Sequence, residues 1–414
     1  MRKVLYLLPA LCLWLLALGC GDQYRPVANP IIGQGGTPQA AHYAFVVNNN
    51  PIGNSSTVQI DVSGDGSLQI QPSGAGAVAE SFLAGTSAAI FTANSLADSV
   101  TEYTTLTTFS PVTTINLPIG SKPISVTSAR TGSMYTLNAS PNTNCPNSGS
   151  ISIINTIALA VVGTDCVGPN PVSFAQVPNG TKIYVANGDN TVSVFDPDLG
   201  AVTTTITQSM GLGVNPVFVI PSIDGTFMFV VNKGDGVNPG SLNMIITSTD
   251  QVGRNIPLGV NPTFAYVDTN LLRLYVANTG SNSVTVFDLS DINLGVLPGI
   301  NTLATVNVGS GPVGITALAD GTRFYTANSV SNDVTVVSAA SYSVLKTVAV
   351  GQNPVFIASE PSSSKVYTAN AASGNVSIIQ TVNDTVTANM AMPAQDSTCT
   401  QSCVPQQPTM ILTF

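Results

Sequence analysis

An aromatic residue stands three positions before an asparagine at eight places along this chain. The successive asparagines are 46, 44, 49, 45, 46, 50 and 42 residues apart. Such a period is too long for leucine-rich or ankyrin repeats and suits a propeller blade of four strands. The pairs are Phe45/Asn48, Phe91/Asn94, Tyr135/Asn138, Tyr184/Asn187, Phe229/Asn232, Tyr275/Asn278, Tyr325/Asn328 and Tyr367/Asn370.

The interior of each repeat predicts strands. In the fourth copy, residues 182–187 are rich in β-formers, residues 191–196 alternate polar with apolar, and residues 202–206 continue in β-branched residues. Asn179-Gly180, Asp224-Gly225 and Asp320-Gly321 fall between the expected first and second strands, where a tight turn needs positive φ. The fold class that follows is all-β, a single β-propeller of four-stranded blades.

A second landmark separates the copies, and it combines glycine with a proline three positions later. It occurs at residues 120–123, 168–171, 213–216, 259–262, 309–312 and 351–354, and each of the last five prolines precedes the next repeat asparagine by 16 residues. Proline cannot donate to a strand ladder, so we expect this element to end one sheet and begin the next, with a residue tolerant of unusual backbone angles beside it.

These residues resemble the YVTN β-propeller repeat family, whose blade carries Tyr-Val-Thr-Asn, a Val-x-Val strand and Val-Gly-x-x-Pro. Here the run reads Tyr-Val-Ala-Asn at 184–187 and 275–278, and Tyr-Thr-Ala-Asn at 325–328 and 367–370. The resemblance covers nearly everything after about residue 42, with copies one to three degenerate. It implies a propeller similar to those of surface-layer and cytochrome d1 proteins, and a surface or periplasmic protein without an assigned reaction.

A propeller must hide its edge strands, so the ring has to close. Residues 408–414 read as the first strand of a blade with no blade after it, and they could complete the blade that contains Phe45. Residues 30–32 compete for that role. Eight landmarks favour eight blades, and seven blades with one unravelled copy is the alternative.

The N-terminus has the pattern of an export signal. Arg2 and Lys3 precede a fifteen-residue apolar run, which is shorter than the roughly 20 residues a membrane-spanning helix needs. Ala17-Leu18-Gly19-Cys20 resembles the bacterial lipobox, although Ala17 stands where Leu is usual; an ordinary secretory signal is the alternative. We predict a signal peptide at 1–19, a lipidated Cys20 with a tether at 20–41, and the propeller at 42–414.

These features predict an exported protein that is anchored to the membrane by its N-terminal lipid. Gly21, rather than an aspartate, follows the cysteine, and by analogy with lipoproteins of diderm bacteria this favours the outer membrane, facing the periplasm or the cell surface. Charged residues are only 8% of the chain, and without Arg2 and Lys3 it has 10 basic against 21 acidic residues, a net charge of −11. Nucleic acid is therefore not an expected partner, because phosphate binding needs clustered Lys and Arg.

After signal removal, four cysteines remain besides Cys20. An even number in an oxidising compartment indicates two disulfides. Three pairings are possible, and we favour Cys145 with Cys166 and Cys399 with Cys403. Zinc binding is the weaker alternative, because the spacings match no familiar zinc pattern and no histidine is near.

Little in the chain suggests catalysis. A Ser-His-Asp triad or a histidine metal site would have to use His42, the one histidine, for which we predict a local structural role. Residues 61–66 mimic half of a calcium loop, but Pro72 stands where the bidentate Glu is required, so a turn is expected. We expect the repeat asparagines to bond backbone groups of their own turns rather than a ligand.

Two insertions break the repeat, at residues 139–148 and 233–240, each between the second and third strands. Inserted loops on one face of a repeat array often meet partners, although neutral drift in loop length is the alternative. We predict a monomeric, non-catalytic binding or scaffolding module without a cofactor, for an envelope protein or glycan. The alternative is a lactonase-like hydrolase or quinoprotein-like oxidoreductase with its site at the central channel, which would need charged groups converging on the axis.

Overall fold

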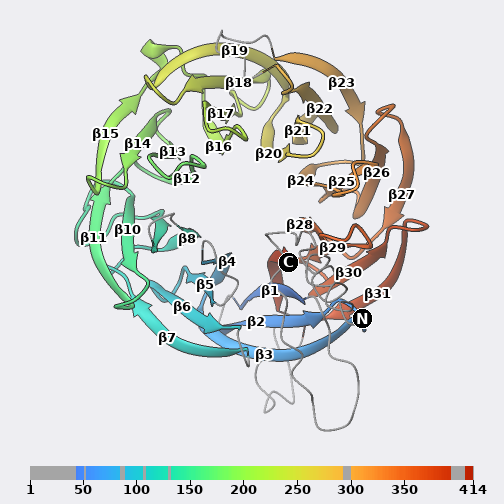
Figure 1. Cartoon of the computed structure of the whole chain (residues 1–414), viewed down its shortest axis with the longest axis horizontal. Helices are drawn as coiled ribbons and strands as arrows, with labels where there is room; N and C mark the ends of the chain where they lie inside the picture. The colour runs from blue at the N-terminus through green and yellow to red at the C-terminus, as the bar shows by residue number, and fades with distance from the viewer. Residues whose placement is uncertain are drawn as a thin grey trace, which may run out of the picture.

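The computed structural model of the chain describes residues 43–50, 53–83, 89–105, 109–128, 132–291, 300–392 and 406–413. These residues form eight four-stranded antiparallel sheets. The sheets stand around a central axis as the blades of a propeller (Figure 1). The predicted fold class is confirmed, and eight blades rather than seven is the correct number.

Each blade has its strands in chain order from the axis outward, except the first, which takes its innermost strand from the C-terminus. Blades one to four consist of β32 (Gln407–Thr413), β1 (Tyr43–Asn49), β2 (Asn54–Asp61) and β3 (Gly66–Ala75); β4 (Ala77–Phe82), β5 (Ala89–Asn94), β6 (Ser99–Thr104) and β7 (Ser110–Asn116); β8 (Pro123–Ser128), β9 (Ser133–Asn138), β10 (Ser150–Asn155) and β11 (Ala160–Cys166); and β12 (Pro171–Gln176), β13 (Ile183–Asn187), β14 (Val192–Asp196) and β15 (Ala201–Ile206).

The second half of the ring repeats the same order. Blades five to eight consist of β16 (Pro216–Pro221), β17 (Phe227–Asn232), β18 (Pro239–Ile246) and β19 (Gln251–Val260); β20 (Pro262–Asp268), β21 (Arg273–Asn278), β22 (Ser283–Asp288) and β23 (Asn301–Asn307); β24 (Pro312–Ala317), β25 (Arg323–Asn328), β26 (Asp333–Ser338) and β27 (Val344–Ala349); and β28 (Pro354–Ser359), β29 (Lys365–Asn370), β30 (Asn375–Gln380) and β31 (Thr385–Ala391). Two short 3-10 helices, η1 (Gln208–Met210) and η2 (Thr279–Ser281), lie between strands.

The ring closes through its C-terminal strand, as predicted. β32 pairs antiparallel with β1, and Ile411 lies opposite Val46 with only 1% of its surface exposed. Figure 1 shows the C-terminus inside the ring beside β1. Residues 30–32, the competing closure segment, lie outside the described residues, and the position they would take belongs to β32.

The repeat asparagines are all fully buried, and each is the last residue of the second strand of its blade, except Asn48, which is the last but one of β1. Their amide nitrogens donate to side chains at the start of the third strand. Asn94 donates to Ser99 and Thr101 across 3.2 and 2.9 Å, and Asn278 donates to Ser283 and Thr285 across the same two distances. The expectation that they bond backbone groups of their own turns is therefore wrong for these donors. The reason is that strand pairing places third-strand hydroxyls beside each amide.

The glycine-proline landmark begins each new sheet and has a left-handed residue beside the proline, as expected. Proline is the first residue of β8, β12, β16, β20, β24 and β28, as predicted. The residue before it, not the glycine, has the left-handed conformation in most copies, for example Asn215 with φ 59°. The glycine is needed for close packing instead: a Cβ on Gly168 would lie 2.5 Å from Cγ of Asn187 in the next blade.

The core lies between neighbouring blades. One cluster joins Phe229 and Leu242 of the fifth blade to Leu274 and Phe287 of the sixth, all of them fully buried. Because strand side chains alternate between the two faces of a sheet, each blade contributes one apolar face to each neighbour. This arrangement keeps the blades together.

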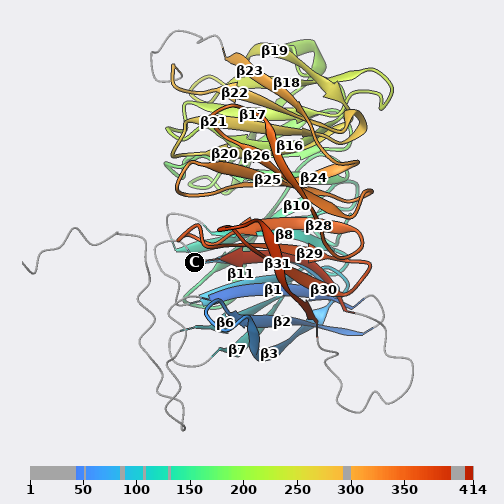
Figure 2. The same cartoon turned by 90° about the vertical axis from the view of Figure 1, so that its right-hand side faces the viewer.

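The ring has two different faces. The face that we call the connection face carries the loops between second and third strands and the connections between blades. The hairpin face carries the loops between first and second strands and the turns between third and fourth. The described chain starts at Tyr43, opposite Asp61, and β32 ends at Thr413, both on the hairpin face; Figure 2 shows the C-terminus on one side of the ring, at this face. None of the described segments forms a helix of the length and apolarity that crossing a membrane would require.

Candidate functional site

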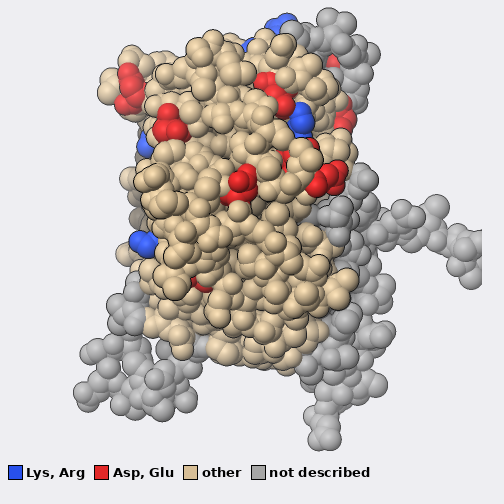
Figure 3. Space-filling view, turned by 90° about the vertical axis from the view of Figure 1, so that its left-hand side faces the viewer, with Lys and Arg blue, Asp and Glu red and all other residues tan. Residues whose placement is uncertain are grey.

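Charge is unevenly divided between the two faces. Among the described residues, the hairpin face carries twelve acidic and five basic side chains: Asp61, Asp65, Asp196, Asp198, Asp224, Asp250, Asp268, Asp288, Asp291, Asp320, Glu360 and Asp384, with Lys182, Arg273, Arg323, Lys346 and Lys365. The connection face carries four acidic and two basic ones: Asp98, Asp189, Asp235 and Asp333, with Lys122 and Lys233. On the side of the ring formed by β7, β11 and β15, charged side chains are few and scattered (Figure 3).

The low charge of the connection face is not required by its turn geometry. Asp98 and Asn190 both take the left-handed conformation, and their side-chain oxygens accept hydrogen bonds of 2.8 and 2.7 Å from the backbone of the following blade connection. Aspartate and asparagine thus serve equally in this turn. The other left-handed positions on this face nevertheless hold asparagine in most copies: Asn170, Asn215, Asn261, Asn282, Asn332 and Asn353.

Acidic residues on the hairpin face act as turn caps. Asp196 accepts hydrogen bonds from the backbone of Asp198 and Leu199 across 2.8 and 3.2 Å. Asp224 accepts one from the backbone of Thr226. Burial alone would raise the pKa of Asp224, but hydrogen bonds from Thr226 and Ser222 hold this pKa below its usual range. Asp224 is therefore ionised at neutral pH.

At the axis, one residue near the start of each innermost strand belongs to what we call the axial ring: the second residue of seven strands and the third residue of β32. Its members are Val78, Ile124, Val172, Val217, Thr263, Val313, Val355 and Thr409. Each one is the extra residue of a β-bulge, where the ladder to the second strand shifts. A bulge re-aims a side chain and is common beside binding sites.

The axial ring is uncharged, mostly aliphatic and open to solvent. Val172 is 46% exposed and the other seven members are half-buried. These side chains belong to the innermost strands of the blades, which border the axis. Each member lies one or two residues after the start of its strand, so the ring lies at the end of the axis on the connection face. It offers a surface for van der Waals contact rather than for acid–base chemistry.

The eight innermost strands, which are described in full, contain two ionisable acids and no lysine, arginine or histidine. The acids are Glu80 and Asp268, which are 1% and 2% exposed. Asp268 accepts hydrogen bonds of 2.9 and 3.1 Å from the backbone of Asn270 and Leu271, so it caps a turn. The convergence of charged groups that the enzyme alternative needs is not found in these strands.

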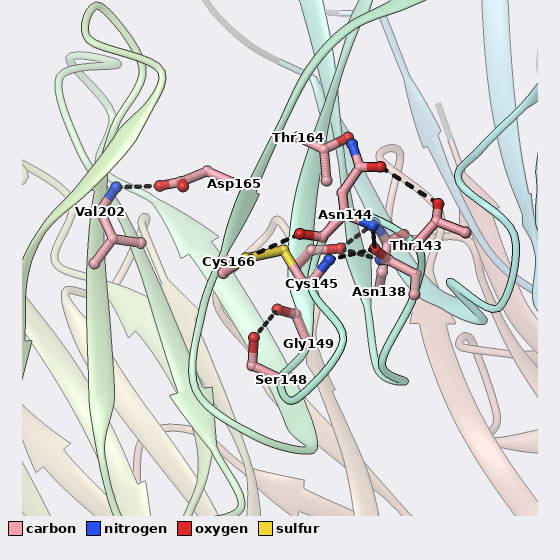
Figure 4. The surroundings of a disulfide bond; sticks show 12 residues. Asn138, Thr143, Asn144, Cys145, Ser148, Gly149, Thr164, Asp165, Cys166 and Val202 are labelled. Carbon is pink, nitrogen blue, oxygen red and sulfur yellow. Dashed lines mark hydrogen bonds between the residues drawn. A yellow bond between two sulfur atoms is a disulfide. The ribbon is translucent and has the colours of Figure 1, made fainter.

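The first inserted loop, residues 139–149, is stapled to the rim of the third blade. Cys145 and Cys166 form a disulfide with their Cα atoms 5.5 Å apart, which confirms the first predicted pair (Figure 4). Asn142 holds the loop from inside: its Oδ1 accepts from the backbone of Asn144 and Cys145, both at 2.9 Å, and its Nδ2 donates to Ser150 across 2.8 Å. The loop therefore has a defined shape on the connection face.

The second insertion forms a shorter loop than expected, residues 233–238, because Pro239 and Gly240 already belong to β18. Asp235 accepts from the backbone of Val237 and Asn238 across 2.9 and 2.7 Å. These hydrogen bonds hold the pKa of Asp235 below its usual range. Val237 at the tip is 80% exposed, so this loop presents an apolar residue on the connection face.

The half calcium loop is a turn, as predicted, and a lysine ammonium lies in it. Lys365 of the eighth blade donates from Nζ to Asp65 and to the backbone oxygen of Val62, both at 2.5 Å. Asp61 accepts from the backbone of Ser63 across 2.7 Å. No group of three or more His, Cys, Asp or Glu in the described part of the chain is arranged to hold a metal ion.

Several predicted residues lie outside the described part of the chain: Cys20, His42, and the pair Cys399 and Cys403. The lipid attachment and the second disulfide remain predictions. The axial ring was missed at the level of sequence, although its signal is there: the residue after each landmark proline is always Val, Ile or Thr.

The chain is similar to other propellers in structure, although no protein-family model and no curated protein sequence matches it. A hydrazine synthase chain of Kuenenia stuttgartiensis superposes with a TM-score of 0.57 at 17% identity, covering 74% of this chain and 95% of that one. A candidate 6-phosphogluconolactonase of Bacteroides fragilis gives 0.56 at 12% identity, covering 90% and 98%, and one of Bacteroides uniformis gives 0.55 at 12%, covering 76% and 98%. At these identities the likeness is one of fold.

Proposed function

We propose that this protein is a non-catalytic binding module of the cell envelope, which is held by a lipid on Cys20 and binds an uncharged partner, a glycan or a neutral protein surface, on its connection face. The observation that carries the proposal is the division of charge, because the connection face holds asparagine where aspartate would serve the same turn. A cationic partner would favour acidic residues there, and a polyanion would favour basic ones.

The orientation of the chain supports the proposal. The described chain starts on the hairpin face at Tyr43, so a tether at 20–41 would leave the ring from that side. The acidic hairpin face would then be turned toward the membrane, and the connection face, with the axial ring and both inserted loops, would be turned away from it. Exposed apolar residues on the connection face include Ile119, Val237 and Val330, which are 71–80% exposed.

The test adds charge to the connection face without altering its turns. The triple variant Asn190→Asp, Asn282→Asp and Asn332→Asp keeps every turn acceptor, and Asp98 shows that the carboxylate fits. Binding to neutral glycan arrays and to purified envelope proteins should fall at least tenfold. The matched control, Asp198→Asn with Asp291→Asn on the hairpin face, should bind as the unmodified protein does. Equal binding by all three proteins would refute the proposal.

The anchor needs a separate experiment. Cells that express the full chain should incorporate labelled palmitate into it and retain it in the membrane fraction, whereas the Cys20→Ser variant should be unlabelled and released. The lactonase alternative is examined with 6-phosphogluconolactone as substrate. Hydrolysis that is lost in a variant of the axial ring would favour the enzyme.

A further inference from the structure

Glu80 breaks the repeat at a position that is otherwise apolar. It lies in β4, opposite Thr92, the residue two before a landmark asparagine. The same position, fixed by the same strand pairing, is apolar in the other seven blades: Val126, Phe174, Val219, Ala265, Ile315, Ile357 and Ile411. Only the second blade therefore has a carboxyl group at the position where the other seven blades have an apolar side chain.

The carboxyl group lies at the seam between the second blade and the first, which contains the closing strand. Glu80 is 1% exposed, and neither of its carboxyl oxygens has a hydrogen-bond partner. Its backbone nitrogen donates to Sδ of Met410 in β32 across 3.4 Å. Hydroxyl groups border the seam: Oγ1 of Thr57 in the first blade is 3.4 Å from Oγ1 of Thr92 in the second.

No basic side chain on the described strands of these two blades balances this carboxyl group. The strands that make up the two blades carry no lysine, arginine or histidine among their described residues. Their titratable groups are Tyr103 on the same face of the second blade, Glu102 on its opposite face, and Tyr43 and Asp61 at the hairpin end of the first blade. Burial raises the pKa of Tyr103, so that phenol stays neutral.

An ionised carboxylate buried without a partner costs several kcal/mol, so such a group binds a proton instead. Burial accordingly raises the pKa of Glu80 well above its usual range. In the closed ring the carboxyl group is neutral, and the seam can stay dry. When the carboxyl group ionises, water has to enter the seam beside β32, whose Met410 accepts from the backbone nitrogen of Glu80.

We propose that Glu80 is a proton-binding site that couples pH to the packing of the closing strand β32 against the second blade. The folded ring holds this proton at a pH where the unfolded chain, with an ordinary carboxyl pKa of about 4.3, has lost it. The seam is therefore most stable below the pKa that Glu80 has in the unfolded chain. Its stability decreases as pH rises from there toward the raised pKa of Glu80 in the folded ring. The unfolding constant changes by up to tenfold per pH unit in this window.

The experiment follows hydrogen exchange of the β32 and β4 amides in the full chain from pH 5 to 9, corrected for intrinsic exchange rates. Protection in the unmodified protein should fall several-fold per pH unit. Glu80→Gln, which keeps the shape, and Glu80→Val, which restores the residue type of Val126, should both be protected independently of pH. Glu102→Gln is the matched control, and its β32 amides should keep the pH dependence because Glu102 faces away from the first blade.

Two results would overturn the proposal. One is the same pH dependence of β32 protection in Glu80→Gln as in the unmodified protein. The other is a protection of the β32 amides that rises with NaCl or KCl but not with choline chloride, and that no longer depends on these salts in Glu80→Gln. This result would mean that the carboxylate holds a metal cation rather than a proton.

Discussion

Tyr184 of the fourth blade donates its hydroxyl proton to Asp250 of the fifth across 2.5 Å, and Lys182 donates to the same carboxylate across 2.7 Å. The seventh and eighth blades repeat this arrangement, with Tyr325 donating to Asp384 across 2.6 Å. Both aspartates have positive φ in the turn between third and fourth strands. In these two blades the landmark tyrosine thus anchors the turn of the next blade.

The tyrosine hydroxyl should therefore contribute measurably to stability. Tyr184→Phe removes a buried hydrogen bond to a charged group, so the free energy of unfolding should fall by about 1–3 kcal/mol in urea titrations. Tyr275→Phe is the control, because its hydroxyl has no partner in the described structure, and its effect should stay within about 0.5 kcal/mol. Equal effects would mean that the aspartate contact contributes nothing.

The landmark glycine should not tolerate a methyl group. A Cβ on Gly168 would lie 2.5–2.7 Å from three atoms of Asn187, which cannot move without losing its bonds to Thr191 and Ser193. Gly168→Ala should cost about 1–3 kcal/mol. Gly66→Ala, with nothing within 4 Å of the added Cβ, should change the melting temperature little. A neutral Gly168→Ala would contradict the close-packing role.

The disulfide should stabilise the third blade by restricting the unfolded chain. Cys145 and Cys166 are 21 residues apart, for which the chain-entropy estimate is about 3 kcal/mol. The double variant Cys145→Ser, Cys166→Ser should lose about that amount of unfolding free energy, and reduction should not destabilise it further. If the unmodified protein unfolds at the same urea concentration with and without reductant, this prediction is wrong.

Closure of the ring should depend on the buried side of β32. Ile411 is 1% exposed and packs with Val46 and Val58 of the first blade, so Ile411→Ala should cost about 2–4 kcal/mol. Gln407 is on the same strand but exposed, and Gln407→Ala should be nearly neutral. The free energy of unfolding of both variants is measured in urea. A loss in Ile411→Ala but not in Gln407→Ala would show that the buried side chains of β32 stabilise the closed ring.

Glu360 should make the ring sensitive to acid, in contrast to Glu80. Burial favours its neutral form, but hydrogen bonds from Ser362 and Ser364 outweigh this and hold the pKa of Glu360 below its usual range. A carboxyl group with a lowered folded pKa adds stability that is present above about pH 4.3 and is lost as pH falls through the folded pKa. Glu360→Gln should therefore lower the free energy of unfolding by a pH-independent amount above pH 5, and it should flatten the acid limb of the stability curve, as urea titrations at a series of pH values would show.

The repeat was readable from the sequence because its landmarks are local. Strand pairing within one blade places Pro171 opposite Asn187, three residues after Tyr184. The offset between these landmarks is therefore the same in most copies, and it indicates the repeated sheet. Closure by residues 408–414 and the Cys145–Cys166 pair were also predictable, the first because a propeller must hide its edges and the second because both cysteines belong to one repeat.

Tertiary structure alone decided which residues meet between blades. Tyr184 meets Asp250, and Glu80 meets Met410, across 66 and 330 residues of sequence, and no spacing rule links such pairs because each blade contacts its neighbour through a whole sheet face. The sequence by itself determined the four-stranded repeat and the order of the sheets, and it favoured eight sheets over seven. Only the closed ring decided which side chains face the axis, which faces carry charge, and where a carboxyl group is buried without a partner, because each depends on packing neighbouring sheets at a fixed angle around one axis.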